Sequence, residues 1–389
     1  MADSTRLGTY LTTSVAGESV RAFMPPPLPP EPPLQLTPAL QDLIEKANRG
    51  LGRLDGVARV FPQPELFLYM YVRKEALLSS QIEGTQSSLS DLLLFEASEA
   101  PGVPLDDVEE VSNYVAAMNH ALERMQGGFP LSQRLLCETH GVLLAGARGA
   151  NKMPGEFRRT QNWIGGSRPG NATYVPPPPE RLMECMGLLE KFLHDDPLKT
   201  PLLIKAALAH VQFETIHPFL DGNGRLGRLL ITLLLCAEGA LARPLLYLSL
   251  YFKTHRNVYY ELLQRVRTDG AWEAWLEFFL NGVIDTTEQA THSAQRILEL
   301  FAGDRARVEK LGRPAASALR LHQLLQERAI TSIRGAAKNL SLSQPTVIAS
   351  IKHLERLGMV REQTGRRRNR LFVYDQYLKI LSEGTEPLR

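Results

Sequence analysis

The stretch His217-Pro-Phe-Leu-Asp-Gly-Asn-Gly-Arg-Leu-Gly-Arg228 carries an imidazole, a carboxylate, a Gly-Asn-Gly turn and two guanidinium groups within twelve residues. Gly222 and Gly224 tolerate positive φ, so the backbone N–H groups around Asn223 can turn inward as an anion-binding nest. Residues 225–238 have helical length and an apolar face, which places this nest at a helix N-terminus. The stretch therefore predicts a phosphate site.

The charged side chains of this stretch suit a polyphosphate. Asp221 can place one oxygen on a Mg²⁺ that also binds phosphate oxygens, the usual arrangement where few protein ligands are available. Arg225 and Arg228 lie three residues apart on one helical face, so both can fork onto a polyphosphate. His217 ends the preceding helix and can act near the same phosphate as a general base. The alternative, a polar helix-to-helix loop with a structural histidine, leaves most of these groups without a role.

The stretch resembles the signature of the Fic family, HxFx(D/E)GNGRxxR, and meets all its fixed positions. In enzymes of this family the histidine deprotonates a hydroxyl of a target protein, which attacks the α-phosphate of ATP. AMP stays on the protein while Mg²⁺-diphosphate departs. The resemblance implies that His217 is the base, Asp221 the Mg²⁺ ligand, and Arg225 and Arg228 the β/γ-phosphate clamps. The nucleotide-binding residues that it implies in this stretch are Asp221, Gly222, Asn223, Gly224, Arg225, Leu226, Gly227 and Arg228, with Gly222 to Gly224 as the anion hole.

The composition is that of an ordinary globular protein. The chain has 389 residues, 44% hydrophobic and 22% charged, with room for two or three domains. Cys137, Cys185 and Cys236 are far apart in apolar helical contexts and are expected to be reduced core residues. We find no run of 18 apolar residues, and residues 1–14 lack the apolar region of a signal peptide. We therefore expect a cytoplasmic protein that does not bind or span a membrane.

Residues 24–34 contain seven prolines between Pro25 and Pro33, which favours extended polyproline II and excludes helix. The favoured interpretation is an extended arm packed along the next domain. An SH3-type ligand is the alternative.

Helical periodicity over residues 64–83 ends in a short polar pattern. Ser79 and Glu83 are four residues apart on one helical face, and Gly84 is placed to stop the helix. Alone, this pattern is typical of a surface serine and a solvated glutamate. Beside the signature it matches the inhibitory motif of the Fic family, (S/T)xxxE(G/N). The resemblance implies that Glu83 reaches Arg228 and occupies the place of the γ-phosphate, so that ATP binds unproductively.

Two β-prone pieces, residues 160–164 and 172–175, flank a loop rich in Gly, Ser, Pro and Asn, which predicts a hairpin. In position it resembles the flap of the Fic family, whose edge strand pairs with an extended target segment. The candidate flap residues are Trp163, Ile164, Gly165 and Gly166. An ordinary structural hairpin is the alternative.

Amphipathic periodicity predicts further helices over residues 106–125, 131–144, 180–194, 199–215 and 271–301. His140 in the second of these is expected to be a core or interhelical histidine. Residues 244–261 are rich in aromatic rings, which usually belong to the core. The family resemblance implies instead that a tyrosine of the pair lines the adenine pocket, Tyr259 first and Tyr260 second.

The end of the chain differs in charge. From residue 313 to residue 389 there are 14 Lys and Arg against six Asp and Glu, a net +8, whereas the remaining residues carry 30 against 36, a net −6. Residues 341–357, with Ser343 as an N-cap and Pro345 in the first turn, fit the second helix of a helix-turn-helix.

Residues 358–374 read as strand, basic tip and strand, so this end of the chain resembles a winged helix. The tip residues suited to phosphate contact are Arg366, Arg367, Arg368 and Arg370. Winged helices also serve as dimerisation or protein-docking modules, so DNA, a protein and a second copy in a homodimer are all candidate partners.

We therefore predict a mainly α protein: a Fic-type helical bundle with a β-hairpin flap, followed by a C-terminal winged helix-turn-helix domain. The expected domains are an N-terminal arm and inhibitory-helix region (1–105), a Fic catalytic domain (106–302) and the winged helix (313–389). The expected activity is transfer of AMP from ATP to a Ser, Thr or Tyr hydroxyl of proteins, including the chain itself, with autoinhibition by Glu83. The alternative is a nucleotide-sensing, DNA-binding transcriptional regulator.

Overall fold

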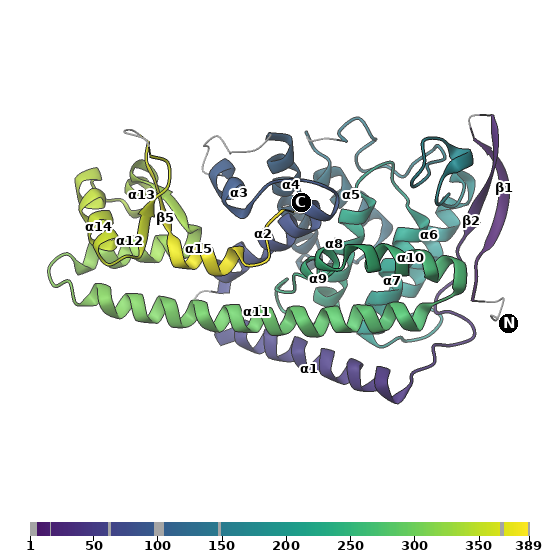
Figure 1. Ribbon diagram of the computed structural model, residues 1–389, viewed down its shortest axis with the longest axis horizontal. Helices are drawn as coiled ribbons and strands as arrows, with labels where there is room; N and C mark the ends of the chain where they lie inside the picture. The colour runs from purple at the N-terminus through teal and green to yellow at the C-terminus, as the bar shows by residue number, and fades with distance from the viewer. Residues whose placement is uncertain are drawn as a thin grey trace.

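The computed structural model describes residues 6–15, 17–60, 64–96, 105–146, 149–365 and 369–387. The described part is elongated and mainly helical, as the sequence predicted (Figure 1). A two-stranded hairpin lies at one end and a small helical and β domain at the other. The main helical bundle, which holds the signature stretch, lies between them.

The hairpin consists of β1 (Thr9–Val15) and β2 (Glu18–Met24), with Thr9 opposite Met24. No strand was predicted here, although Thr9–Val15 is rich in β-branched residues. An isolated two-stranded hairpin is marginal in water, and this one is supported by packing, because Val20 and Ala22 bury against Val175. The proline-rich segment that follows lies along the bundle, where Gln212 Nε2 donates to the Pro26 carbonyl at 2.7 Å.

The first helices of the bundle are α1 (Pro38–Val60), α2 (Pro64–Ile82), α3 (Leu89–Glu96), α4 (Leu105–Gln126) and α5 (Gln133–Leu143). The α3 helix lies in a segment for which no helix was predicted. It buries Leu89, Leu92 and Leu93.

The second half of the bundle contains α6 (Pro179–Leu193), α7 (Leu202–Ile216), α8 (Asn223–Ala237), α9 (Ser249–Thr254) and α10 (Arg256–Asp269). Helix α7 is buried from Leu203 to Ile216. Such a helix has no solvent face and occupies the centre of a bundle. It packs against α8, so the loop between these two helices, which contains the signature, is held on both sides.

The predicted flap hairpin is reduced to one bridge. Ile164 and Tyr174 pair, with hydrogen bonds of 2.8 and 3.1 Å, but no longer ladder forms. Gly165 and Gly166 have positive φ, and a single 3₁₀ turn, η1 (Pro169–Asn171), follows them. These turns draw the chain away from its partner after one pair.

The end domain contains α12 (Ala315–Arg328), β3 (Ile330–Ser332), α13 (Ile333–Leu340), α14 (Gln344–Arg356), β4 (Val360–Glu362), β5 (Leu371–Tyr374) and α15 (Asp375–Ser382). Its sheet has the antiparallel order β3-β5-β4. Ser343 caps α14, since its Oγ accepts from the Thr346 N–H at 3.3 Å, as the sequence predicted. Of the predicted tip residues, Arg366, Arg367 and Arg368 lie outside the described part of the chain, and Arg370 is exposed.

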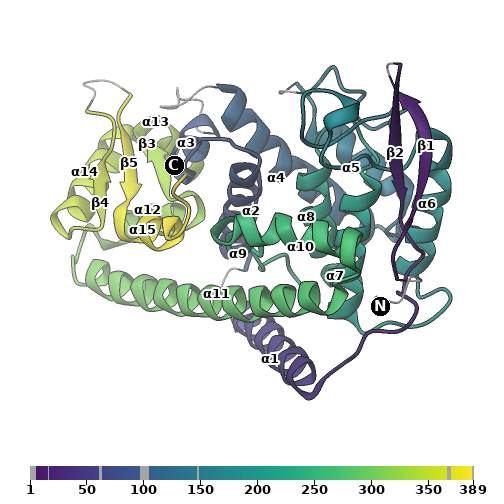
Figure 2. The ribbon, with the colours of Figure 1, turned by 45° about the vertical axis from the view of Figure 1, so that its right-hand side comes forward.

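Helix α11 (Trp272–Glu309) joins the bundle to the end domain, and both views show it running alongside the two parts (Figures 1 and 2). At its far end the Tyr374 hydroxyl donates to Asp304 Oδ2 at 2.8 Å, which docks the end domain on α11. None of the helices in the described ranges combines the length and apolar character needed to cross a membrane.

Candidate active site

His217 stands where α7 ends. It adopts φ 50°, a left-handed conformation that turns the chain out of the helix. The buried Arg158 holds this turn, donating from Nε to the His217 carbonyl and from its backbone N–H to the Pro218 carbonyl, both at 2.9 Å. Arg158 was not singled out in the sequence, where nothing links it to residues about sixty positions away.

The imidazole of His217 faces the site in its neutral form. Its Nδ1 is buried and has no hydrogen-bond partner among the described residues. Burial, together with the guanidinium groups of Arg267 and Arg158, lowers the pKa of His217 to about 4. A neutral imidazole at pH 7 is the form that can accept a proton from a hydroxyl.

The loop after His217 is held by side-chain hydrogen bonds. Asn223 Oδ1 accepts from the Phe219 N–H at 2.9 Å, and Asn223 Nδ2 donates to the Phe219 carbonyl at 2.8 Å. Gly222 is the N-cap of α8 and takes φ 75°, as the predicted nest requires. Its N–H, however, donates to Asp221 Oδ1 at 2.6 Å, so an anion would have to compete with that carboxylate for it.

His140 of α5 also holds this loop. Its Nδ1 accepts from the Gly155 N–H at 2.9 Å, so Nε2 carries the proton and donates to the Asp221 carbonyl at 3.0 Å. The ring stacks on Phe219 with centroids 3.8 Å apart. The sequence suggested a core or interhelical histidine, and the structure makes it a positioning residue for Asp221.

Asp221 faces a cavity of about 240 Å³ with 40% of its side chain exposed. Within the described ranges no group of three or more His, Cys, Asp or Glu is arranged to hold a metal. A single carboxylate beside a cavity lined by Arg225 fits Mg²⁺, which keeps waters and substrate oxygens as its other ligands. Asp221 is therefore the residue that would hold the ion.

The two signature arginines have different partners. Arg225 is buried and pairs with Glu110 of α4, Nη1 to Oε2 at 3.2 Å, and its Nη2 lies 3.6 Å from Asp221 Oδ1. Glu110 is buried as well and was missed in the sequence, because its helix gives no sign of which residue it meets.

Arg228 is bound by the end of α2. Its Nε donates to Ser79 Oγ at 2.9 Å, and its Nη2 donates to the Ser79 carbonyl at 3.0 Å and to Glu83 Oε1 at 2.6 Å. Partial burial raises the pKa of Glu83, whereas its ionic and hydrogen-bond contacts with Arg228 lower it. The net shift is downward, so the carboxylate is ionised. The pair therefore joins two full charges.

Two glycines allow Glu83 to reach this position. Gly84 takes φ 106° just after α2 ends, a backbone conformation that residues other than glycine rarely adopt. Gly224 lies beneath the carboxylate, and a Cβ there would overlap Glu83 Oε1.

A second cavity of about 370 Å³ adjoins the first, and the two share Glu83, His217 and Gly224. The second cavity is also lined by the candidate flap residues Ile164 and Gly165, by Arg228, and by the predicted adenine-pocket residues Tyr259 and Tyr260. Other predicted residues stand outside both cavities, namely Trp163, Gly166, Leu226 and Gly227.

The tyrosine pair is divided between core and surface. Tyr259 is buried, and its hydroxyl lies 2.8 Å from His210 Nε2. Since His210 Nδ1 donates to the Gly227 carbonyl at 2.9 Å, the tyrosine must be the donor in the first bond. Tyr260 keeps 41% of its surface exposed. Tyr259 therefore presents only part of its ring to the cavity, and Tyr260 has the freer side chain.

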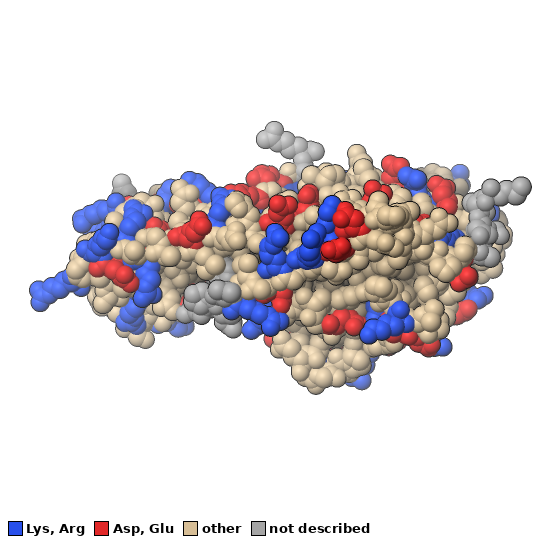
Figure 3. All heavy atoms as spheres, turned by 90° about the horizontal axis from the view of Figure 1, so that it is seen from below, with Lys and Arg blue, Asp and Glu red and all other residues tan. Residues whose placement is uncertain are grey.

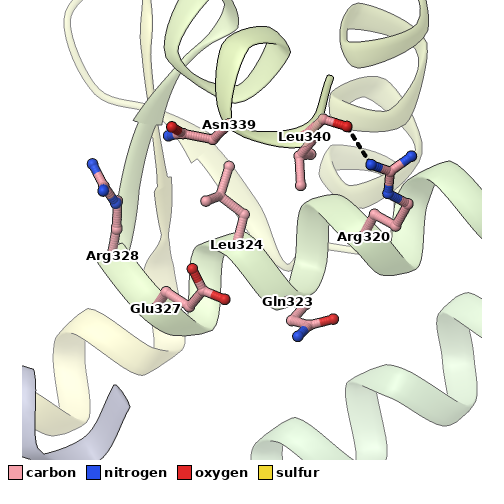
Figure 4. A pocket seen from close by; sticks show the side chains of 7 residues that line it. All are labelled: Arg320, Gln323, Leu324, Glu327, Arg328, Asn339 and Leu340. Atoms are coloured by element: carbon pink, nitrogen blue, oxygen red, sulfur yellow. Dashed lines mark hydrogen bonds between the residues drawn. The ribbon is translucent and has the colours of Figure 1, made fainter. Parts of the chain in front are cut away.

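A third cavity, of about 340 Å³, lies in the end domain between α12 and α13. Its wall carries Arg320, Glu327, Arg328 and Asn339 (Figure 4). The Arg320 guanidinium donates to the Leu340 carbonyl and so ties the end of α13 to α12. This cavity is separate from the signature site.

Comparison with known proteins agrees with this geometry. The description "Fic/DOC family N-terminal" matches residues 41–123, and "Fic/DOC family" matches residues 130–235. The fold and site thus define a helical protein built from a Fic N-terminal domain and a Fic domain. The chain belongs to the Fic/DOC family.

Relatives named "Protein adenylyltransferase Fic" cover part of the chain. The one from Culex quinquefasciatus is 32% identical over 214 residues, 54% of this chain and 38% of the relative. The one from Drosophila melanogaster is 28% identical over 211 residues, 54% of this chain and 39% of the relative. The chain thus spans about two fifths of the length of these relatives.

Solved structures share the fold. A Fic family protein from Desulfovibrio desulfuricans G20 has a TM-score of 0.58 at 20% identity, covering 88% of this chain and 97% of its own. A Fic domain containing signaling protein from Bacteroides thetaiotaomicron has a TM-score of 0.50 at 20% identity, covering 66% of this chain and 96% of its own. At this level of identity the likeness concerns the fold alone.

Proposed function

We propose that this chain is a protein adenylyltransferase that transfers AMP from ATP to a Ser, Thr or Tyr hydroxyl of proteins, itself included. The observation that carries the proposal is the cavity of about 370 Å³. The neutral imidazole of His217 lines it together with Arg228 and the candidate flap residues Ile164 and Gly165. The names of the relatives point to the same chemistry. We expect the reaction to take place in the cytoplasm.

In the proposed reaction His217 removes the proton of the target hydroxyl. The oxygen attacks the α-phosphorus of ATP, a new P–O bond forms, and the bond to the β-phosphate breaks. AMP remains on the target oxygen and diphosphate leaves. The flap holds the target segment in line with the α-phosphate, and Tyr260 and the ring of Tyr259 line the base pocket.

Asp221 would hold Mg²⁺, which supplies positive charge to the phosphates when bound. The carboxylate can take this role without a large rearrangement, because its oxygens already face the cavity. When the carboxylate turns to the metal, the Gly222 N–H that now donates to Asp221 Oδ1 becomes available to an anion.

In the proposed resting state Glu83 inhibits the enzyme. Its carboxylate occupies Arg228, which the γ-phosphate must reach. A carboxylate and a phosphate cannot share one guanidinium without like-charge repulsion. ATP would therefore bind displaced until Glu83 withdraws.

The test uses purified chain and ATP labelled at the α-phosphate. Glu83→Gly should raise self-modification by on the order of tenfold, because Arg228 is released. His217→Ala in the Glu83→Gly background should lose about 10² to 10⁴ of that rate while retaining ATP binding.

Two results would count against the proposal. Transfer from ATP labelled at the γ-phosphate alone would indicate a kinase-like reaction. Full turnover in the variant lacking His217 would assign the base elsewhere. Glu261→Gln, at an exposed position of α10, serves as a matched carboxylate control.

A second candidate function is nucleotide-controlled DNA binding by the end domain. Helices α13 and α14 are joined by a short turn, and Lys352 and Arg356 are exposed on α14. On the face drawn in Figure 3, Lys and Arg spread over the end of the molecule formed by this domain. DNA retardation that weakens steeply with salt, and that is reduced in Lys352→Ala, would support this function.

A further inference from the structure

The segment after α15, residues 383–387, leaves the end domain and returns to the bundle. Figures 1 and 2 show the chain turning back from α15 toward α2. Thr385 is buried there with 3% exposure. We refer to residues 383–387 as the C-terminal strap.

The strap is held through its backbone by buried side chains of the bundle. Lys74 Nζ donates to the Glu383 carbonyl at 2.8 Å, and Gln81 Nε2 donates to the Thr385 carbonyl at 2.8 Å. Lys253 Nζ of α9 donates to the Gly384 carbonyl at 3.2 Å and also to the Glu386 carbonyl. Each donor is at least nine-tenths buried with the strap in place, so the strap supplies acceptors for polar groups that it covers.

The strap also fits the bundle closely. A Cβ at Gly384 would lie 2.9 Å from Leu250 Cδ1, and Gly384 takes φ 77°. The Glu383 carboxylate accepts two hydrogen bonds from Arg296 of α11, at 2.7 and 2.8 Å. Helices α2, α9 and α11 therefore all contact the strap.

Two of the donors belong to the helix that carries the inhibitory residues. Gln81 lies between Ser79 and Glu83, and its Nε2 also donates to the Ser87 carbonyl at 2.9 Å. It thus joins the end of α2, the loop that follows and the strap. Residues two apart do not face each other on a helix, so Gln81 can hold the strap while Glu83 faces Arg228.

We propose that the C-terminal strap is the intramolecular partner that keeps the end of α2 in its inhibitory position, and that detachment of the strap releases Glu83 from Arg228. This inference rests on the proposed function for its effect on activity. Its structural part, support of α2 by the strap, is independent of any reaction.

The first experiment compares a chain ending at Ser382 with a chain ending at Pro387, which retains every contact described above. Relative to the full chain, amide hydrogen exchange of the peptide spanning residues 79–85 should be about tenfold faster in the chain ending at Ser382. It should be unchanged in the chain ending at Pro387. In the same pair, self-modification with α-labelled ATP should rise without the strap, to less than the Glu83→Gly level.

The second experiment uses the full chain and does not depend on folding of the shortened one. Lys253→Met removes the donor to Gly384 and Glu386 and changes no residue of α2, although α9 itself packs against α2. Exchange of residues 79–85 should accelerate by about threefold. Lys191→Met, at an exposed lysine of α6, should leave it unchanged.

The outcomes separate the two proposals. Wild-type exchange of residues 79–85 in folded Lys253→Met would overturn the role of the strap. Faster exchange with no self-modification in any variant, Glu83→Gly included, would support the strap and reject the proposed reaction.

Discussion

The two arginines of the signature lie one helical turn apart on α8, yet they are held in different ways. Arg225 pairs with Glu110, and both side chains are buried, with 4% and 5% exposure. Arg228 is equally buried, but its carboxylate partner, Glu83, keeps 36% of its side chain exposed. One arginine is thus paired inside the bundle and the other at an accessible cavity.

This difference indicates which side of α8 can respond to a ligand. Glu110 lies within α4, which packs against α2, α5 and α8. Glu83 follows the last residue of α2 and is succeeded by a glycine, so it can withdraw without moving a packed helix. Release of Arg228 therefore requires a local change, whereas release of Arg225 requires separation of two helices.

The largest expected effect concerns the buried pair. Glu110→Gln removes one charge and leaves Arg225 with only the Asp221 carboxylate, 3.6 Å away, which should lower the free energy of unfolding by about 3 kcal/mol, the lower end for a broken buried pair. Urea denaturation followed by circular dichroism measures it. Glu109→Gln, beside it on α4 but outside the pair, is the control. A loss no larger than in the control would mean that the two sides of α8 are equally easy to release.

The next effect concerns the accessible side. In the Glu83→Gly background, Arg228→Ala removes a charged donor for the γ-phosphate and should weaken ATP binding by about 100-fold, since a hydrogen bond to a charged group contributes about 1.5 to 3 kcal/mol. Calorimetric titration with ATP and Mg²⁺ checks this. With Glu83 present the same substitution should change affinity less, because Arg228 is already occupied. Equal affinity with and without Arg228 would remove it from the phosphate clamp.

Sequence and structure agree best where the chemistry is local. The signature could be interpreted because His217, Asp221 and the arginines follow one another within twelve residues. Their supports could not be predicted, because Glu110, His140 and Arg158 come from segments whose own patterns are those of ordinary amphipathic helices or loops. Spacing along the chain shows which residues share a face, but not which distant residue meets that face.

The fold was predicted in the same uneven way. The mainly α class followed from helical periodicity, and the Ser343 cap of α14 from its residue type. The β1–β2 hairpin was missed because its stability depends on packing against Val175. Tyr259 was ranked before Tyr260 for the adenine pocket, but only the packing of α10 decides which ring is buried, and the buried ring is that of Tyr259.

Acid should lower the free energy of unfolding, because a neutral histidine holds the loop before α8 and another holds the first turns of α8 itself. His140 supports Asp221 and His210 supports Gly227, and burial lowers their pKa values to about 4 and about 3. Below about pH 6.5 the unfolded chain gains protons that the folded chain does not, so stability falls as pH decreases toward the folded pKa values. The expected loss is about 1.4 kcal/mol per pH unit for each histidine.

Urea denaturation at about pH 7 and about pH 5.5 measures this loss. His140→Asn should reduce the difference by the share of one histidine. An identical pH dependence in His140→Asn would show that this imidazole titrates normally in the folded chain.

The smallest effect separates the two contacts that Arg228 makes with α2. Ser79→Ala removes the hydroxyl that accepts from Arg228 Nε but leaves the Ser79 carbonyl and Glu83 in place. Self-modification should rise by about threefold, the effect of one hydrogen bond and less than in Glu83→Gly. A rise equal to that of Glu83→Gly would mean that the hydroxyl, rather than the carboxylate, controls Arg228.

Helix α11 continues without a break for 38 residues from the bundle into the end domain. At 1.5 Å per residue it is a rod of about 57 Å. Because this helix is continuous, the Ile164–Tyr174 bridge and α14 are held at a set separation. A change in the end domain would therefore reach α8 through local detachment of a few residues from the bundle surface. A partner that binds both ends of the molecule has to match the distance that α11 sets between them.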